Sequence, residues 1–450
     1  MMAKNLQGFH YGVAVTDLDG DGAFEFVVAC SRGSNRVMRW DGLRLVDSAG
    51  GLLADTQRQA IGLCGADVDG DGREELYVLN TDTFAGQKHH ADRLLDADAT
   101  GRLVDLFELG HNEDALNLTS GRSVGCVDRL GTGRYAFVVT NYGGAMRCYE
   151  VGSDAGIVDM AIEAGLAYAA GGRSLLCAPL VSDHEMDIFL GAELGPNRLF
   201  RAAGNGTYED VGAALGVADP DGNARGVAAL DADSDGALDL VWANWEGPAR
   251  MMLQVPGQSF LDVTPATMAE PSLVRTVIAA DFDNDGYEEI FFNSMGEPNR
   301  LFAVRERRWQ RVDPGSADEP HGLGTGAAVA DIDGDGVLEL LVAHGESAPQ
   351  PLSLHKAARA AEGNHWIRVA PKTRFGAPAR GAVVRVESGG RVQLRVIDAG
   401  SGYLCQMEPV AHVGLNRIDR VERVTVTWPD GATTTMERPA ADTTHVVRHP

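Results

Sequence analysis

The sequence predicts an all-β protein, in which a seven-bladed β-propeller is followed by a small C-terminal β-sandwich-like domain. An acidic nine-residue loop between strand-like segments recurs with a period of 50 residues, and about four strand-like segments fill each period. The period is lost near residue 360, where a different all-β pattern begins. We therefore expect the propeller over residues 8–360 and the second domain over residues 361–450.

The acidic loop is clearest at residues 331–339, which read DIDGDGVLE and lie between two apolar runs. Carboxylates at positions 1, 3, 5 and 9 and glycines at positions 4 and 6 can wrap a hard cation. Calcium fits best, because it takes roughly six to eight oxygen ligands in flexible geometry. An EF-hand would carry a glutamate at position 12 between two helices, whereas position 12 is Val342 and both flanks are strand-like. The loop is therefore predicted to be a strand-loop-strand calcium site.

Five full copies of this loop occur, and about five calcium ions are expected to stabilise the blades. The predicted ligands are Asp17, Asp19, Asp21 and Glu25; Asp67, Asp69, Asp71 and Glu75; Asp231, Asp233, Asp235 and Asp239; Asp281, Asp283, Asp285 and Glu289; and Asp331, Asp333, Asp335 and Glu339. The gap between the second and third copies has room for two more units. Residues 128–136 and 179–187 are eroded copies, so we expect weak or empty sites near Asp128 and Asp183.

Each unit contains the strands of one blade. In the first unit, residues 11–16 lead into the loop and residues 24–29 leave it, and two shorter strands follow at residues 35–40 and 43–46. The second unit carries a polar insertion at residues 87–114, which is expected to be a surface loop. The seventh unit shows only three strands, and an unpaired edge favours a fourth. Either the first eight residues or the segment after residue 360 could supply it.

The C-terminal segment has its own strand pattern, and a module of this size is expected to pack on the propeller. Its predicted strands are residues 366–370, 382–387, 392–397, 421–428, 433–437 and 445–448. Lys372, Arg374 and Arg380 form the one basic cluster, which is either a solvated face or a dock for the acidic propeller.

Composition and charge exclude several functions. The net charge of −25 argues against nucleic acid as a partner, because phosphate binding needs a basic face. Twenty of the 64 acidic residues lie in the five loops, so metal sites explain much of the acidity. No apolar run is long enough to span a membrane. The six cysteines lack metal-binding spacing and are expected to be buried reduced thiols, although their even number leaves a disulfide pair open.

Catalytic motifs are weak. No Gly-x-Ser-x-Gly elbow is present, and a glycine-rich stretch at residues 322–326 enters a strand rather than a helix. His344 and Glu346 either perform acid-base work at the mouth of the propeller or satisfy local hydrogen bonds.

Two sets of motifs resemble known families. The acidic units are similar to FG-GAP repeats, also called VCBS repeats, of the integrin alpha-chain propeller. The tail, with NHWIR at residues 364–368, GSGYL at 400–404, HVGL at 412–415 and VTWPDG at 426–431, resembles an ASPIC/UnbV domain. Together they cover nearly the whole chain and resemble the cartilage acidic protein family. The first eight residues have no apolar core of the signal-peptide kind, and no cysteine-rich EGF-like module follows the tail, so a bacterial or short-form member is expected.

The resemblance implies an acidic, secreted, calcium-binding propeller, extracellular or periplasmic, that acts as a cell-surface interaction or adhesion module. We expect a monomer without enzymatic activity that binds a protein or glycan on a propeller face. The alternative is a calcium-dependent carbohydrate-active enzyme of the polysaccharide lyase kind. That alternative predicts a cluster of Tyr, His, Arg and Lys side chains at one mouth of the central channel.

Overall fold

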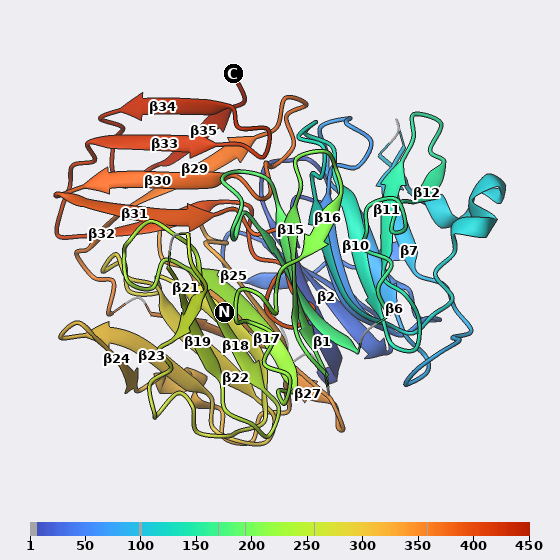
Figure 1. The fold of residues 1–450 in the computed structure, drawn as a ribbon, viewed down its shortest axis with the longest axis horizontal. Helices are drawn as coiled ribbons and strands as arrows, with labels where there is room; N and C mark the ends of the chain where they lie inside the picture. The colour runs from blue at the N-terminus through green and yellow to red at the C-terminus, as the bar shows by residue number, and fades with distance from the viewer. Residues whose placement is uncertain (1–6, 99–100, 170, 194, 256, 358) are drawn as a thin grey trace.

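The computed structural model describes residues 7–98, 101–169, 171–193, 195–255, 257–357 and 359–450 of the chain. Antiparallel sheets form the blades of a propeller, and the C-terminal strands pack on one side of it (Figure 1). The first strand of each blade contacts the first strand of the next, and that of the seventh blade contacts that of the first, so the ring is closed. The predicted all-β fold with a seven-bladed propeller is confirmed.

The strands of each blade run outwards from the propeller axis in chain order. The innermost strands are β1 (Gln7–Thr16), β5 (Ala60–Ala66), β9 (Gly121–Val127), β13 (Gly172–Ala178), β17 (Ala224–Leu230), β21 (Val274–Ala280) and β25 (Gly324–Ala330). The second strands are β2 (Glu25–Arg32), β6 (Glu75–Asn80), β10 (Ala136–Asn141), β14 (Asp187–Ala192), β18 (Asp239–Asn244), β22 (Glu289–Ser294) and β26 (Glu339–His344). The third strands are β3 (Arg36–Trp40), β7 (Arg93–Ala97), β11 (Arg147–Val151), β15 (Arg198–Ala202), β19 (Arg250–Gln254), β23 (Arg300–Arg305) and β28 (Ser353–Lys356). The outer strands are β4 (Leu45–Asp47), β8 (Leu103–Asp105), β12 (Ile157–Asp159), β16 (Tyr208–Asp210), β20 (Phe260–Asp262) and β24 (Arg308–Val312).

The core lies between neighbouring blades. Every residue of β5, β9, β13 and β25 is buried, because both faces of a blade are covered. Most residues of such strands are small or apolar without alternation, although β9 and β13 carry an arginine and a serine near their start. Between the second and third blades, the rings of Tyr77 and Phe137 lie 5.3 Å apart. This packing explains why the inner strands were recognisable in the sequence.

Helices are few and short. They are α1 (Gly51–Ala54) and the 3-10 helices η1 (Leu106–Glu108), η2 (Gly110–Ala115) and η3 (Gly315–Asp318). In the described ranges, no helix has the length and apolar character needed to cross a membrane.

A segment of the C-terminal region fills the central channel of the propeller. We call residues 398–410 the plug. Its backbone and side chains hydrogen-bond to all seven innermost strands, through the pairs Cys126–Ala399, Cys177–Gly400, Val227–Gly402, Thr276–Tyr403, Ala327–Cys405, Val13–Gln406 and Gly65–Gln406. Residues 399–410 are all buried. The plug therefore joins the seven blades to one another and to the C-terminal strands.

The second blade corrects one expectation. The polar segment at residues 87–114 contains β7 and β8, the outer half of that blade, and is therefore not only a surface loop. Arg93 explains its polar character, because this buried side chain pairs with both Asp55 and Asp105 at 2.7 Å. A buried ion-pair network resembles a polar loop when only the sequence is read.

The seventh blade has three strands, β25, β26 and β28, and in the described chain no fourth strand pairs with β28. Among the described residues, neither residues 7–8 nor the segment after residue 360 supplies one. Gln7 and Gly8 pair instead with β27 (Gln350–Pro351), which lies beside β1, while the chain after residue 360 enters the C-terminal sheets. Residues 1–6 lie outside the described ranges. The expected fourth strand is therefore not found in the part of the chain that the structure describes, where the inner ring and the β1–β27 pair close the propeller.

The C-terminal strands form two facing sheets. One contains β29 (His365–Lys372), β32 (Ala411–Asn416) and β35 (Thr444–Arg448), and the other contains β30 (Val383–Ser388), β31 (Arg391–Val396), β33 (Arg423–Thr427) and β34 (Thr433–Glu437). Ile367, Val384 and Trp428 are buried between them. The structure contains all six strands predicted for the tail and adds β32. The sheets make a sandwich beside the propeller rather than an eighth blade (Figure 1).

All six cysteines are buried and unpaired, as expected for reduced thiols. Burial raises the pKa of the Cys30 and Cys148 thiols to about 12. The reactive thiolate form is therefore disfavoured, and these cysteines act as small core residues.

The plug gives a stability prediction. Gly12 on β1 faces the plug, and a methyl group added there would overlap the carbonyl oxygen of Leu404. Gly12→Ala should lower the free energy of unfolding by about 1–3 kcal/mol, because β1 or the plug must shift. Gly110→Ala is the control, since an added methyl group there meets nothing within 4 Å. Urea unfolding that shows equal stability for both variants would contradict the tight packing of the plug.

Candidate metal centre

The five acidic loops connect the first and second strands of their blades, and their backbones share one design. The ninth residue of each loop is the first residue of the second strand. The sixth residue has a positive φ in every copy, between 83° and 96°, which favours glycine. The fourth position is also left-handed, and there Ser234 and Asn284 replace glycine. The loops therefore bend in the same way wherever the glycine pattern recurs.

The loop carboxylates accept hydrogen bonds from the loop backbone in a repeated pattern. The first aspartate accepts the N–H of the sixth residue, as from Gly22 to Asp17 at 2.9 Å and from Gly336 to Asp331 at 3.0 Å. The ninth residue accepts the N–H of the second, at 2.7–3.1 Å in all five loops. These bonds turn the acidic side chains into the loop, so the backbone concentrates negative charge there.

The structure brings the predicted site residues together. Three carboxylates have oxygen atoms within 4.8 Å of one another in four loops: Asp17, Asp19 and Asp21; Asp67, Asp69 and Asp71; Asp231, Asp233 and Asp239; and Asp281, Asp283 and Asp285. In the fifth loop, the Lys356 ammonium group contacts Asp333 at 2.9 Å, Asp335 at 2.8 Å and also Glu339. These clusters of acidic residues could hold metal ions.

Several loop oxygens fit a cation because they lack any other partner. Asp281 Oδ1, Glu289 Oε1 and Asp331 Oδ1 are buried and receive no hydrogen bond from the described residues. A buried carboxylate oxygen without a donor is costly, whereas a bound cation satisfies it. The metal ligands that the loops offer are carboxylate and backbone oxygens. Such ligands suit a hard ion such as calcium.

The electrostatics of the loops point the same way. Burial, together with repulsion from neighbouring carboxylates, raises the pKa of Glu25, Asp67 and Asp239 to about 7 and that of Asp231 to about 6. Without a cation, such groups stabilise the fold only while protonated. Their contribution to the stability of the fold is fully present below the pKa of these groups in the unfolded chain, about 4. It is lost as the pH rises through about 7. A cation that neutralises the loop removes this cost.

The third strand of the blade adds a residue to most loops, and sequence reasoning missed these residues. Arg39 pairs with Asp19 at 2.8 Å, and Arg305 pairs with Asp283 and Asp285 at 3.2 Å. In the second blade the third strand supplies Asp96, whose carboxylate lies within 4.8 Å of those of Asp69 and Glu75. The only signal in the sequence is the position of these residues in the third strand. That position can be recognised once the strands of the different blades are aligned.

The two eroded loops keep fewer of the acidic positions of the motif. Asp128 keeps the backbone pattern, since it accepts N–H groups from Thr132 at 2.9 Å and Gly133 at 2.6 Å. In the fourth blade Asp187 accepts from Val181 and Ser182, at 2.7 and 2.9 Å. In both loops the carboxylate is engaged by the protein's own donors, so these loops close without the charge density of the full copies.

The C-terminal sandwich lies on the face that carries the acidic loops. Gly414 donates its N–H to Asp281 Oδ2 at 2.9 Å, and Arg368 pairs with Asp331 Oδ2 at 2.9 Å. Arg380 is fully buried and pairs with Glu74 at 2.6 Å. Of the basic cluster predicted from the sequence, Arg380 is thus a dock for the acidic propeller. Arg374 also reaches the propeller, since it donates to the Gly131 carbonyl oxygen at 3.3 Å, and it pairs with Asp430 inside the tail at 2.7 Å.

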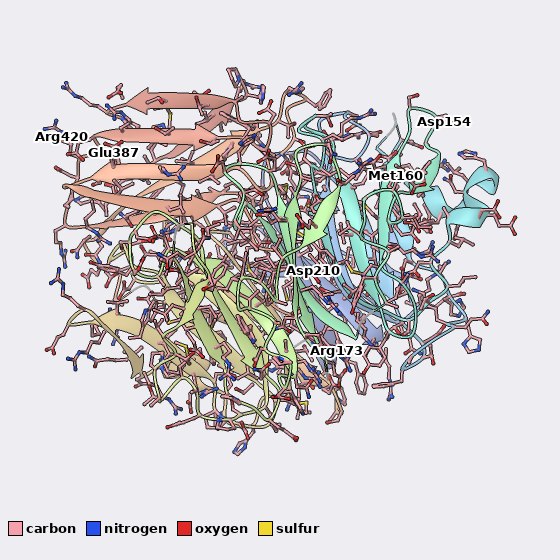
Figure 2. All side chains as sticks on the ribbon, viewed as in Figure 1. Asp154, Met160, Arg173, Asp210, Glu387 and Arg420 are labelled. Carbon is pink, nitrogen blue, oxygen red and sulfur yellow. The ribbon has the colours of Figure 1, made fainter. Side chains whose placement is uncertain are left out.

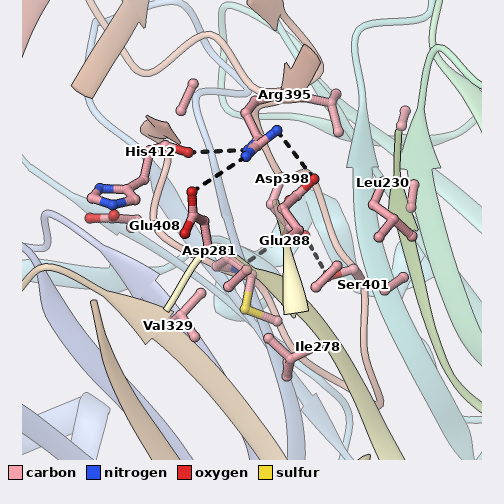
Figure 3. A pocket seen from close by; sticks show the side chains of 18 of the residues that line it. Leu230, Ile278, Asp281, Glu288, Val329, Arg395, Asp398, Ser401, Glu408 and His412 are labelled. Atoms are coloured by element: carbon pink, nitrogen blue, oxygen red, sulfur yellow. Dashed lines mark hydrogen bonds and ion pairs between the residues drawn. The ribbon is translucent and has the colours of Figure 1, made fainter. Parts of the chain in front are cut away.

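A small cavity of about 90 Å³ marks the junction of loop, plug and sandwich (Figure 3). Arg395 of β31 lies 3.4 Å from Glu288 and 3.9 Å from Asp281, and its Nε donates to the carbonyl oxygen of His412. Burial raises the pKa of Glu408, on the plug side, to about 7, although Arg368 opposes this effect. The cavity therefore lies at the interface between the propeller blades and the C-terminal sandwich.

His344 and Glu346 do not form an acid-base pair. His344 is buried and contacts Glu319 at 3.2 Å, whereas Glu346 pairs with Arg275 at 3.2 Å. Both side chains satisfy local partners.

The fold and the loops define the class of protein: an FG-GAP repeat propeller with an ASPIC/UnbV domain. The model for the FG-GAP-like repeat matches residues 17–78, 181–242 and 231–292, and that for ASPIC and UnbV matches residues 372–450. The chain is 44% identical to cartilage acidic protein 1 of Xenopus tropicalis, over 95% of this chain and 71% of that protein. It is 45% identical to the Homo sapiens protein, over 95% of this chain and 70% of that one. The chain belongs to the cartilage acidic protein family.

Solved structures resemble the chain more distantly. The BP39L lectin from Burkholderia pseudomallei has a TM-score of 0.49 and 13% identity, covering 78% of this chain and 97% of that one. The BBS1N chain crystallised with ARL6DN has a TM-score of 0.48 and 11% identity, covering 79% and 96%.

Calcium should raise the melting temperature, and a chelator should lower it. If each site has a Kd on the order of 0.1 mM, about 1 mM free calcium adds about 1.4 kcal/mol per site, or about 7 kcal/mol for five sites. Asp283→Ala should remove only part of this gain, and magnesium should substitute poorly because it demands octahedral geometry. Asp154→Asn, in a surface turn (Figure 2), is the control. A melting curve indifferent to calcium and chelator would rule out the metal assignment.

Lys356 tests the competition between a side-chain cation and a metal. Lys356→Met removes the ammonium group from Asp333, Asp335 and Glu339. The metal-free protein should become less stable, because the ammonium group no longer offsets the repulsion between the loop carboxylates. The calcium-induced rise in melting temperature should be larger, because calcium then relieves more of that repulsion. Arg201→Met, which breaks an exposed pair with Glu209, should change neither quantity. A smaller calcium response in Lys356→Met would contradict this role.

Proposed function

We propose that this protein is a calcium-dependent binding protein that acts as an extracellular or cell-surface interaction module. Its five acidic loops, with the twenty residues predicted from the sequence, would hold about five calcium ions. The observation that carries this proposal is the set of buried loop oxygens without a donor, Asp281 Oδ1, Glu289 Oε1 and Asp331 Oδ1. Membership in the cartilage acidic protein family supports a location outside the cytoplasm.

Calcium would also secure the C-terminal sandwich. Asp281 and Asp331 each have one oxygen engaged by the sandwich, through Gly414 and Arg368, and one oxygen without a donor. A cation bound to the oxygen without a donor would keep the carboxylate ionised. It would also hold the other oxygen in position to contact Gly414 or Arg368. The metal and the sandwich would therefore contact the same carboxylates. Calcium would thus stabilise the contact between the sandwich and the propeller face that carries the acidic loops.

The enzymatic alternative is less well supported. It requires a catalytic side chain that reaches a substrate proton at the mouth of the channel. Of the tyrosines at this mouth, Tyr403 at the tip of the plug is only 3% exposed, and its hydroxyl lies 3.3 Å from Arg275. A phenol covered in this way favours a structural role, so we assign the protein to binding rather than to catalysis.

The proposal predicts calcium-dependent ligand capture. Arrays of glycans and of extracellular proteins should show a ligand that is retained in calcium and released by a chelator. Asp331→Ala should weaken capture, because it removes a loop carboxylate that also contacts the sandwich, whereas Asp154→Asn should not. Capture that persists unchanged in chelator would count against the calcium-dependent function. Release of an unsaturated uronate from a glycan, seen by ultraviolet absorbance, would favour the lyase alternative.

A further inference from the structure

Four arginines occupy the same place in four successive blades. Arg122, Arg173, Arg225 and Arg275 are each the second residue of an innermost strand, in β9, β13, β17 and β21. They therefore lie at the end of the propeller opposite the acidic loops, and the label of Arg173 in Figure 2 marks this end, away from the C-terminal sheets. We call this end of the channel the arginine mouth.

The four guanidinium groups gather around the tip of the plug. Arg275 lies within 3.3 Å of the Tyr403 hydroxyl and stacks on Trp245, with 4.4 Å between the guanidinium carbon and the ring centre. Arg122 and Arg173 lie over the Tyr142 ring at 5.5 and 5.1 Å. All four arginines are buried, with exposures between 4% and 8%. The plug closes the channel beneath them, so the arginines form the floor of the mouth.

Positive charge exceeds negative charge at this floor. Two carboxylates contact the four guanidinium groups in the described chain: Glu193 binds Arg173 and Arg225, and Glu346 binds Arg275. Within the described ranges, the side-chain hydrogen bonds of Arg122 go to the backbone carbonyls of Gly121 and Phe84.

Unused donors remain in the mouth. The Nε groups of Arg122, Arg225 and Arg275 are buried and have no acceptor among the described residues. Burial, and then the charge of Arg173, lowers the pKa of Arg122. Buried donors and excess positive charge are conditions under which an oxyanion binds well.

The rim of the mouth is aromatic. Phe84 is 67% exposed, and Tyr142 and Trp245 are half-buried. The Phe84 and Tyr142 rings lie 5.3 Å apart, and Arg122 lies 5.3 Å from the centre of the Phe84 ring. Aromatic faces beside guanidinium groups suit a ligand that has both an apolar face and an anionic group. A sugar ring that bears a carboxylate or a sulfate is such a ligand.

We propose that the arginine mouth binds an acidic saccharide, with its anionic group toward the floor beside Arg122 and a sugar ring against Phe84. This site deepens the proposed binding function by naming its ligand class, but it lies at the opposite end from the acidic loops. An extended peptide is a poorer fit, because recognition by main-chain pairing needs an open strand edge and the inner strands are hydrogen-bonded to the plug.

The test uses the calcium-saturated full chain and titration calorimetry. The probes are a glucuronate-containing hexasaccharide, a neutral glucose hexasaccharide, hexaglutamate and inorganic sulfate. The acidic saccharide should bind at least about tenfold more tightly than the others, and its affinity should fall with salt. No binding by any probe would overturn the proposal, as would equal binding of the neutral sugar. Tighter binding of hexaglutamate would replace the saccharide with an acidic peptide, and tighter binding of sulfate would reduce the site to a simple anion site, so either overturns it.

Variants locate the site. Arg122→Gln removes a charge that no carboxylate contacts, and Phe84→Ala trims an exposed ring, so neither leaves an unpaired buried carboxylate. Each should weaken the acidic saccharide at least about tenfold while the melting temperature stays near that of the unaltered protein. Arg201→Gln and Leu43→Ala, at exposed positions elsewhere, are the matched controls. If Arg122→Gln does not fold, Phe84→Ala decides; unchanged binding in the folded variant overturns the site.

The two proposals fail independently. The melting curve in calcium and chelator tests the loops, whereas these variants test the mouth in saturating calcium. A calcium-indifferent protein that still binds the acidic saccharide through Arg122 would retain the site and lose only its calcium dependence.

Discussion

The hydrogen bonds between the plug and the seven innermost strands are the constraint on which the rest of the structure depends. A propeller of this size has a central channel that must be filled, and here residues 398–410 fill it with backbone and side-chain hydrogen bonds to every blade. Because the plug connects β31 to β32, it determines where the sandwich lies. Glycines such as Gly12 and Gly326 occur on the inner strands where the plug or a neighbouring strand approaches closely.

The plug also separates two electrostatic environments. At one end Glu408 lies beside Asp331 and the acidic loops, and at the other end Tyr403 lies beneath the arginines. A chain with a net charge of −25 thereby keeps a concentrated positive site, since the five acidic loops lie at the opposite end.

The acidic loops show how a repeated motif diverges while its backbone stays the same. Each full copy bends through the same left-handed glycine, yet the third strand supplies Arg39, Arg305 or Lys356 in three blades and Asp96 in another. A basic side chain offsets part of the repulsion between carboxylates, whereas Asp96 increases it. The five loops should therefore differ in affinity for a cation although their sequences are nearly the same.

The sequence alone determined the blade count, the all-β class, the family and the twenty loop residues, because these depend on short-range periodicity and on residues within nine positions of one another. The sequence also contains an arginine near the start of each of four inner strands. Only the closed ring of blades shows that these arginines meet at one end of the channel. The tertiary structure alone decided that residues 398–410 enter the channel, that Arg380 meets Glu74, that Asp96 joins Asp69, and that the seventh blade stops at three strands. These contacts join residues far apart in the chain, and no local period records which distant partners are buried together.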